Sequence, residues 1–489
     1  MTIASPIAPL MNADGYKQAH RELYPVGTES VYSNWTNRGS RLQGVDRVVH
    51  FGLQAALQKY LVDEWEQFFA ADEDVVVAEF QRVIASYLGK QAPSAEHIRA
   101  LHRLKYLPLR IKALPEGTLV PVRVPTFTME ETIPEFFWLV GYVETVISAS
   151  YWHRSTVATI AHRYRRQLDT FAACTSDSPE AVNFQAHDFS FRGQTSVEAA
   201  ESAGAGHLLS FTGTDTLPAI LFVERYYPGD NGLIGASIPA TEHSVMCAGG
   251  RENELATFEH ILDVHEDGPV AIVGDTWNLW DVALKILPAL KDRIMARDGK
   301  VVIRPDSGNP FYILCGDWDA DDNTPEAKGL VQLIWELFGG TVNSKGYKEI
   351  DPHIGIIYGD AITYDKMTDI LEELEFQGFA STNVVFGVGS FTYQHVTRDT
   401  FASAVKATWA KVDGEGRNLL KDPITDDGTK KSATGRLAVL RDENGEFVLL
   451  EKAPKIVEDG SFLKTVWEDG KATAPQSFAD VRRVLAEQA

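Results

Sequence analysis

The sequence predicts an α/β protein, with an irregular βα barrel in the middle of the chain and a discontinuous α+β domain built from the N- and C-terminal parts. Seven short apolar runs recur roughly every 30 residues, the spacing of a βα unit. Amphipathic stretches with helical spacing lie between them, at 252–265, 277–295 and 364–376. Each run ends in polar or glycine residues, namely Asp188-Phe189, Thr214-Asp215, Glu242-His243, Gly274-Asp275, Arg304-Pro305-Asp306, Gly359-Asp360 and Gly387-Val388-Gly389-Ser390.

The ends of these runs predict the position of a binding site. The carboxyl ends of parallel barrel strands gather at one face, so these side chains can converge on one pocket. Its carboxylates, arginines and glycines suit a phosphorylated sugar better than an apolar ligand. Asp275-Thr276 could also cap the helix expected to begin near Trp277.

A chain of 489 residues exceeds a typical single hydrophobic core, so two domains are expected. The barrel should occupy residues 151–390. Residues 1–150 and 391–489 should form the discontinuous domain together.

The terminal parts show shorter patterns. Residues 51–62 have helical spacing, whereas 107–114 and 119–128 are typical of strands. Asn444-Gly445 lies between two apolar runs and indicates a hairpin. The apolar stretch 136–152 is too short and too polar to span a bilayer, so we expect a buried helix.

The chain is acidic, with 46 Lys and Arg against 68 Asp and Glu, a net charge of −22. This argues against nonspecific binding to nucleic acid or to an anionic membrane, and a polyphosphate ligand would need a local group of cations. Cys174, Cys247 and Cys315 fit no zinc spacing, and their odd, low number favours a reducing compartment. The N-terminal residues lack a basic region and are interrupted by Pro6 and Pro9, unlike a secretory signal. We therefore expect a cytoplasmic protein.

Two of the strand ends allow both a functional and a structural interpretation. Arg304 and Asp306 could hold a ribose and stack on a flat base, or could form a salt bridge that closes the barrel. Phe189 could stack on a heteroaromatic ring, with Arg192 beside a phosphate, or could simply pack in the core.

His243 could be a proton carrier, a metal ligand, a phosphoryl acceptor or a structural residue, and Asp275 could orient its ring. Gly359-Asp360 and Gly389-Ser390 follow the last two runs, where barrels commonly bind phosphate through backbone N–H groups. There is no P-loop or HExxH motif, and the pattern identifies no metal ligands.

An ordered set of motifs resembles the nicotinamide phosphoribosyltransferase family of type II phosphoribosyltransferases, essentially from end to end. These motifs are Asp14-Gly15-Tyr16-Lys17, His187-Asp188-Phe189, Gly213-Thr214-Asp215-Thr216, 239–244, 303–310, 343–348, Gly359-Asp360, Thr397-Arg398-Asp399, Lys421-Asp422-Pro423 and Gly435-Arg436-Leu437.

The resemblance implies transfer of a phosphoribosyl group from phosphoribosyl pyrophosphate to nicotinamide, with release of pyrophosphate. It also implies Mg²⁺ and a homodimer in which each active site includes residues of the other subunit. The discontinuous domain would contribute to the dimer and to the active site. The nicotinamide ring would lie between Phe189 and Tyr16 of the other subunit, with Arg304 beside it. Asp215 would accept the carboxamide N–H and Asp306 would hold the ribose hydroxyls.

Phosphate groups have their own residues by the same resemblance. The 5′-phosphate would lie among Gly359, Asp360, Gly389 and Ser390, with Arg192 nearby. The pyrophosphate or a nucleotide phosphate tail would be bound by Arg38, Arg398, Lys406, Lys421 and Lys430. The family couples ATP hydrolysis to synthesis through a phosphorylated histidine, whose position is that of His243, with Asp275 near it.

Some positions depart from the family pattern. Ser390 and Phe391 replace small residues at the phosphate site, Ala361 replaces a glycine, and Ala271 replaces a serine that lines the nicotinamide tunnel. Two alternatives remain open at this point. One is nicotinate phosphoribosyltransferase, against which the carboxylate of Asp215 argues because it repels a nicotinate anion. The other is a catalytically silent barrel that binds nucleotides.

Overall fold

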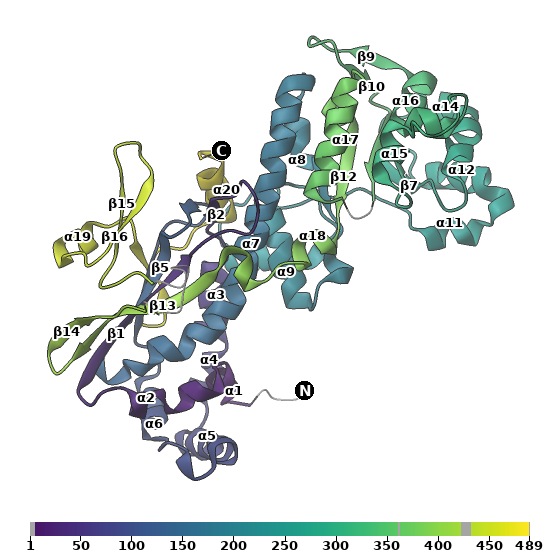
Figure 1. The fold of residues 1–489 in the computed structure, drawn as a ribbon. Helices are drawn as coiled ribbons and strands as arrows, with labels where there is room; N and C mark the ends of the chain where they lie inside the picture. The colour runs from purple at the N-terminus through teal and green to yellow at the C-terminus, as the bar shows by residue number, and fades with distance from the viewer. Residues whose placement is uncertain (1–4, 360–361, 422–431, 489) are drawn as a thin grey trace. The chain divides into compact units, whose positions relative to one another are not determined.

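The computed structural model describes residues 5–359, 362–421 and 432–488. They divide into two compact units, each drawn in Figure 1. Unit 1 comprises Met1–Thr159, Phe222–Gly232 and Val396–Ala489, and unit 2 comprises Ile160–Leu221 and Leu233–His395. The expected domain limits fall near these boundaries, but the segment Phe222–Gly232, which we had assigned to the barrel, packs with unit 1.

Unit 2 contains the barrel. Its five parallel strands follow the order β6-β12-β11-β8-β7, with β6 at Ala186–Asp188, β7 at Val270–Val273, β8 at Val301–Arg304, β11 at Ile354–Tyr358 and β12 at Val384–Val388. Three isolated parallel bridges, Asp188↔Thr214, Gly213↔Ala236 and Ala240↔Ala271, continue the ladder from β6 back to β7. Seven segments therefore close into a ring in the order of the chain, which confirms the predicted irregular βα barrel.

Helices separate the segments of the ring along the chain. The expected helices are present as α12 (Glu254–Val264), as α13 (Leu279–Asp281) continuing into α14 (Leu287–Met295), and as α17 (Tyr364–Phe376). The expected cap at Asp275-Thr276 is wrong, because Asn278 caps α13 by accepting from Trp280 N at 3.0 Å. The Asp275 carboxylate instead accepts from residues after β8, as described below.

Unit 1 is built on an antiparallel sheet. The sheet has the order β14-β13-β1-β5-β3-β17-β18, with β14 at Glu415–Asn418, β13 at Ser403–Val412, β1 at Thr28–Asn37, β5 at Pro125–Glu131, β3 at Leu109–Ala113, β17 at Lys464–Glu468 and β18 at Lys471–Ala472. Trp35 of β1 stacks on Phe127 at 5.9 Å and meets Tyr151 edge-on at 5.0 Å, so aromatic side chains fill the core beneath the sheet. The hairpin predicted at Asn444-Gly445 is confirmed by the pairing of β15 (Ala438–Arg441) with β16 (Phe447–Leu450).

Two further helices that begin in unit 1 agree with the sequence in type but not always in extent. The helical pattern at 51–62 is confirmed as α3 (Leu53–Gln58), which continues into a π-helical turn at Lys59–Asp63. The apolar stretch at 136–152 belongs to α7 (Trp138–Thr175), a helix of 38 residues that runs well past the expected end. Among the described residues, none of the helices is both long enough and apolar enough to cross a membrane.

One expected strand of unit 1 is in fact two. The run at 119–128 divides into β4 (Leu119–Pro121), which pairs with β2 (Arg47–Val49), and β5, which belongs to the main sheet. A tight turn separates them, in which Val124 N donates to Pro121 O at 3.1 Å. The physical reason is that Pro121 and Pro125 bracket the turn and favour a break in the strand.

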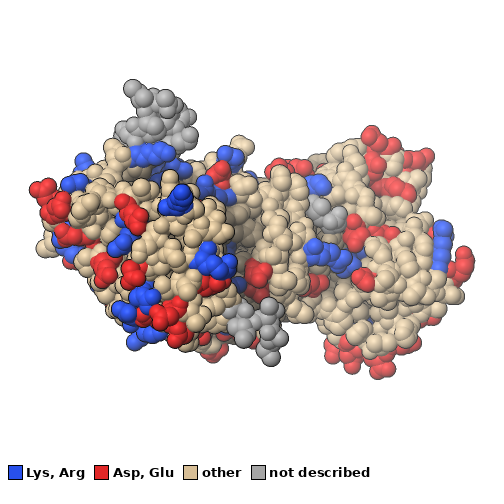
Figure 2. All heavy atoms as spheres, turned by 90° about the horizontal axis from the view of Figure 1, so that it is seen from below, with Lys and Arg blue, Asp and Glu red and all other residues tan. Residues whose placement is uncertain are grey.

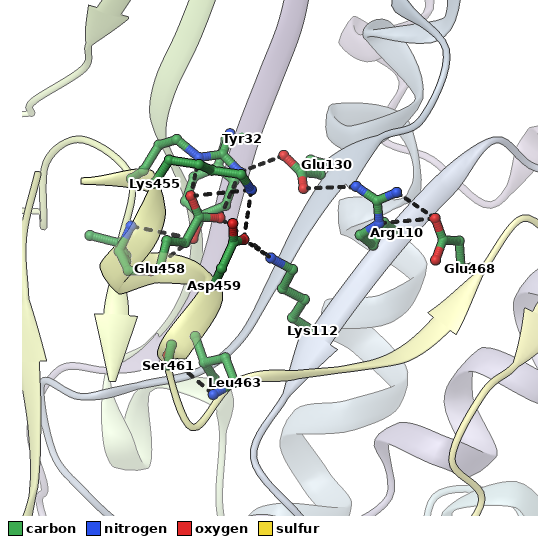
Figure 3. A network of polar contacts seen from close by, with 12 residues as sticks. Tyr32, Arg110, Lys112, Glu130, Lys455, Glu458, Asp459, Ser461, Leu463 and Glu468 are labelled. Carbon is green, nitrogen blue, oxygen red and sulfur yellow. Dashed lines mark hydrogen bonds and ion pairs between the residues drawn. The ribbon is translucent and has the colours of Figure 1, made fainter. Parts of the chain in front are cut away.

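A network of charged side chains around the buried Glu458 joins a C-terminal helix to this sheet (Figure 3). Arg436 lies 2.6 Å from Glu458 of α19 (Lys455–Gly460) and 2.7 Å from Glu130 of β5. Lys112 of β3 lies 3.6 Å from the same Glu458, whose side chain is 2% exposed. The network therefore holds α19 and the segment around Arg436 against the sheet.

Candidate active site

The barrel encloses a pocket of about 330 Å³. Alternate residues of a strand face the same side, so one side chain from each of several strands points into the barrel. These inward residues are apolar: Ala271 of β7, Val302 of β8, Ile357 of β11 and Val385 of β12. His187, Phe189, Asp215 and Arg304 add polar and aromatic groups at the carboxyl ends of the strands, as the sequence predicted for three of them. The result is a flat apolar slot with a charged end.

Phe189 lies both in the core and at the pocket. It packs against the buried residues Ala271, Val302 and Ile357, and it also lines the pocket. The guanidinium carbon of Arg304 lies 5.8 Å from the centre of its ring. Gly387 makes this placement possible, because a Cβ there would come within 2.9 Å of the Phe189 ring. A planar heteroaromatic ligand in the slot would therefore find an aromatic face and a cation.

Asp215 is held by two neighbours that the sequence did not single out. His187 Nε2 lies 2.9 Å from Asp215 Oδ1, and Ser237 Oγ donates to the same oxygen at 2.6 Å. Burial alone raises the pKa of Asp215, but hydrogen bonds from His187 and Ser237 and the charge of Arg304 bring it below the ordinary value. Asp215 is therefore a carboxylate at neutral pH, placed at the wall of the slot.

His243 and two carboxylates form a second group at the strand ends. His243 Nε2 lies 3.0 Å from Asp306 Oδ1 and 3.9 Å from Asp275 Oδ1, while Nδ1 lies 3.2 Å from Thr276 Oγ1. Asp275 Oδ2 accepts from the backbone N–H of Asp306 and of Ser307, both at 2.8 Å, and from Ser307 Oγ at 2.6 Å. Asp275 thus fixes the turn that carries Asp306, while the imidazole, 45% exposed, stays open to a ligand.

The same group offers a site that a divalent cation fits. Asp275 Oδ1 is buried and accepts no hydrogen bond from the described residues. One ligand atom each from His243, Asp275 and Asp306 lies within 4.8 Å of the others. Mg²⁺ prefers oxygen ligands and commonly takes one or two carboxylates together with substrate phosphates. The two aspartates meet that requirement, with Asp275 Oδ1 as the oxygen that lacks a partner.

Of the two glycine-rich strand ends, the first lies close to Asp306 and the second close to the turn of Arg192. Gly359 N donates to Pro305 O at 2.8 Å, and a Cβ on Gly359 would lie 2.9 Å from Asp306 Cβ. Ser390 begins α18 (Ser390–Gln394), and its Oγ lies against Gly193, where a Cβ would meet it at 2.0 Å. Ser390 therefore lies next to the turn that carries the exposed Arg192. The candidates Asp360 and Lys430, and the departure at Ala361, lie outside the described residues.

Most of the predicted phosphate-binding cations gather in unit 1. A pocket of about 200 Å³ is lined by Arg38 and Lys406, together with Arg123, which the sequence did not indicate. Burial first, and then the charges of Arg38, Lys421 and Arg398, lower the pKa of Lys406. Three of the five predicted cations therefore lie close enough to a fourth, Lys406, to act on its charge. On the face shown in Figure 2, Lys and Arg side chains lie among carboxylates. Tyr16, also of unit 1, is 64% exposed.

Comparisons with known proteins agree on the relationships of the chain. Residues 184–468 match the nicotinate phosphoribosyltransferase family, and residues 8–90 match the nicotinamide phosphoribosyltransferase N-terminal domain. A relative from Acinetobacter baylyi, named nicotinamide phosphoribosyltransferase, is 50% identical over 99% of this chain and 98% of its own. One of the same name from Mycoplasma pneumoniae is 35% identical over 87% of this chain and 94% of its own. The crystal structure of nicotinate-nucleotide pyrophosphorylase from Pyrococcus furiosus shares the fold, with a TM-score of 0.55 and 16% identity over 100% of this chain and 97% of that one.

Proposed function

This chain belongs to the nicotinate phosphoribosyltransferase family, and we propose that it transfers the phosphoribosyl group of phosphoribosyl pyrophosphate to nicotinamide. The products are nicotinamide mononucleotide and pyrophosphate, a step of pyridine nucleotide (NAD) biosynthesis. The observation that carries the choice of base is the ionised Asp215 in the wall of the aromatic slot. A carboxylate there accepts the N–H of a carboxamide and repels the carboxylate of nicotinate.

The residues of the barrel suit the chemistry of this transfer. The pyridine nitrogen has a free lone pair at neutral pH, so the reaction needs no general base. Positive charge develops at C1 of the ribose and negative charge on the departing pyrophosphate, so catalysis depends on positioning and electrostatics. The Phe189 and Arg304 side chains orient the ring, and Asp306 is the carboxylate that we assign to the ribose. Mg²⁺ held by Asp275 and Asp306 would supply charge for the phosphates.

His243 is our candidate for coupling synthesis to ATP. Attack of an imidazole nitrogen on the γ-phosphorus of ATP would give phosphohistidine and ADP, and water would later release phosphate from it. Two features support this role. The imidazole is 45% exposed, and its orientation is held by Asp306 at Nε2 and by Thr276 at Nδ1. A purely structural histidine would need no such access.

Two further parts of the proposal rest on the family resemblance. We propose that Arg38, Arg398, Lys406, Lys421 and Lys430 bind pyrophosphate or a nucleotide phosphate tail. We also propose a homodimer in which Tyr16 of a second copy meets the nicotinamide ring. The Tyr16 ring lies tilted against His20 at 5.3 Å, and its 64% exposure supports such a contact on the solvent side.

The test is an assay of mononucleotide formation with purified protein, phosphoribosyl pyrophosphate and Mg²⁺, supplied with nicotinamide or nicotinate in parallel. The wild type should prefer nicotinamide. Asp215→Asn should lower the ratio of kcat/KM for nicotinamide over nicotinate by at least about ten-fold, because it removes both a charge-assisted hydrogen bond and a repulsion. Ser237→Ala, which keeps the Asp215 charge, is the matched control.

The outcomes separate the alternatives. Product from nicotinate alone would replace the substrate but keep the reaction. An unchanged ratio in Asp215→Asn would remove Asp215 from substrate selection. No product from either base would favour a catalytically silent nucleotide-binding barrel.

A further inference from the structure

Arg123 lines the basic pocket of unit 1, although no sequence pattern pointed to it. It lies in the turn between β4 and β5 and is exposed, with a φ of +72°. The bond from Val124 N to Pro121 O makes Arg123 the third residue of a four-residue turn. A positive φ at this position defines a type II turn, which favours glycine or asparagine. An arginine strains the backbone here, and the turn itself gives no reason for one.

Hydrogen bonds hold this strained residue at the pocket. Arg123 N donates to the carbonyl of Asn37 at 2.7 Å, and Ser403 Oγ donates to the Asn37 side chain at 2.6 Å. Asn37 ends β1 and Ser403 begins β13, and the residues next to them, Arg38 and Ala404, line the pocket. The turn is therefore tied to β1 directly and to β13 through Asn37, and both strands contribute to the pocket.

A second left-handed residue serves the same pocket. Ala402 has a φ of +48°, and its carbonyl accepts from Arg38 Nε at 3.0 Å. Six of the described non-glycine residues have a positive φ. Two of them serve this pocket: Arg123 lines it, and Ala402 holds Arg38, which also lines it. Such strain persists where the surrounding structure enforces it, and it gathers at binding sites. The lining side chains include three cations, Arg38, Arg123 and Lys406, against the carboxylate of Glu451.

We infer that Arg123 is a further phosphate-binding residue of this pocket. Its ligand is a polyphosphate, which is either pyrophosphate or the phosphate tail of a nucleotide. The inference rests on the proposed function, which produces the first and uses the second. One charge-assisted contact to a phosphate oxygen corresponds to a roughly ten-fold change in affinity.

The experiment is calorimetric titration of the full-length protein with magnesium pyrophosphate and, separately, with the magnesium complex of a non-hydrolysable ATP analogue. Arg123→Asn removes the charge and introduces a residue that tolerates positive φ, so its Tm should equal or exceed that of the wild type. Lys105→Asn is the matched control, because Lys105 is also exposed, left-handed and in unit 1, but does not line the pocket.

We expect Arg123→Asn to weaken binding about ten-fold in at least one arm and Lys105→Asn to leave both unchanged. The arm that responds tells which polyphosphate Arg123 contacts. Unchanged affinity in both arms, an equal loss in Lys105→Asn, or a wild type that binds neither ligand would overturn the inference. The titration involves no phosphoribosyl transfer, so a specific loss in a protein that makes no mononucleotide would refute the proposed function and leave Arg123 in place.

Discussion

Removal of Arg436 should destabilise unit 1 strongly, and the structure indicates by how much. Arg436→Met keeps an unbranched apolar stem but removes the guanidinium group, and it leaves Glu458 without its 2.6 Å partner. Removing one member of a buried ion pair typically costs about 3–5 kcal/mol, because the remaining charge stays desolvated. Lys112 and Lys455 still lie 3.6 Å and 4.0 Å from Glu458 and reduce that penalty. We therefore expect a loss of about 3 kcal/mol, at the lower end of that range.

The measurement is urea unfolding at pH 7, followed by tryptophan fluorescence. Arg110→Met is the matched control, since Arg110 belongs to the same network but its main partner, Glu468, is half-buried, with side chains 35% and 34% exposed (Figure 3). Its second carboxylate, Glu130 at 3.6 Å, keeps the closer Arg436. We expect this control to lose less than the buried pair, closer to the roughly 0.2–1 kcal/mol of an exposed pair. The reasoning is refuted if Arg436→Met costs no more than Arg110→Met.

The same network has a pH dependence whose sign can be worked out. Burial raises the pKa of Glu458, but the hydrogen bond and charge of Arg436 and the charges of Lys112 and Lys455 bring it below its ordinary value of 4.5. A depressed pKa contributes stability above that ordinary value, and the contribution is lost as the pH falls through the folded-state pKa. The gap between wild type and Arg436→Met should therefore narrow in acid.

Three more predictions follow from single residues. His243→Ala should abolish the stimulation of synthesis by ATP while slow ATP-independent synthesis remains; full stimulation in the mutant would exclude His243 as the phosphoryl acceptor. Gly359→Ala, just after β11, should lower kcat/KM for phosphoribosyl pyrophosphate by roughly ten-fold or more, because the new Cβ would displace Asp306. Gly355→Ala, within β11, crowds only the flexible Lys300 side chain and meets Val302 at an ordinary contact distance of 3.6 Å, so it should be nearly silent in the same assay. Burial raises the pKa of Glu131 to about 7, so its folded form holds a proton that the unfolded chain releases near 4.5, and stability falls as the pH rises between these values. Glu131→Gln should therefore gain stability over the wild type on going from pH 5 to pH 8, and equal differences at the two pH values in chemical unfolding would contradict this.

The barrel could be predicted because its information is local. Each strand of the ring is a short apolar run, and each run ends where parallel strands bring their carboxyl ends together. The sequence therefore predicts Phe189, Asp215 and Arg304 as site residues, and they line one pocket. Ser237 could not be identified, because it follows a segment with no strand pattern and reaches Asp215 only through the bridge Gly213↔Ala236.

Unit 1 was harder to predict because its contacts are long-range. The pairing of β1 with β13 joins Asn34 to Lys406, and Arg436 reaches Glu130 across 306 residues of sequence. No periodicity records such partners. The helix start at Asp275-Thr276 was wrong for a related reason: both are good caps, but tertiary hydrogen bonds from Asp306 and Ser307 engage the Asp275 carboxylate.

The charge of the chain poses a question that the two units answer separately. A protein with a net charge of −22 repels polyphosphates on average, so binding depends on cations held in one place against their mutual repulsion. In the barrel, the ionisable groups that we assign to the base and the ribose are largely carboxylates, among them Asp215 and Asp306. The described cations assigned to pyrophosphate or a nucleotide phosphate tail lie in unit 1, where burial first and then the neighbouring positive charges lower the pKa of Lys406. Changes at Asp215 should then alter selection between bases, and changes at Arg123 should alter polyphosphate affinity. This division of roles is wrong if changes at Asp215 alter polyphosphate affinity, or if changes at Arg123 alter selection between nicotinamide and nicotinate.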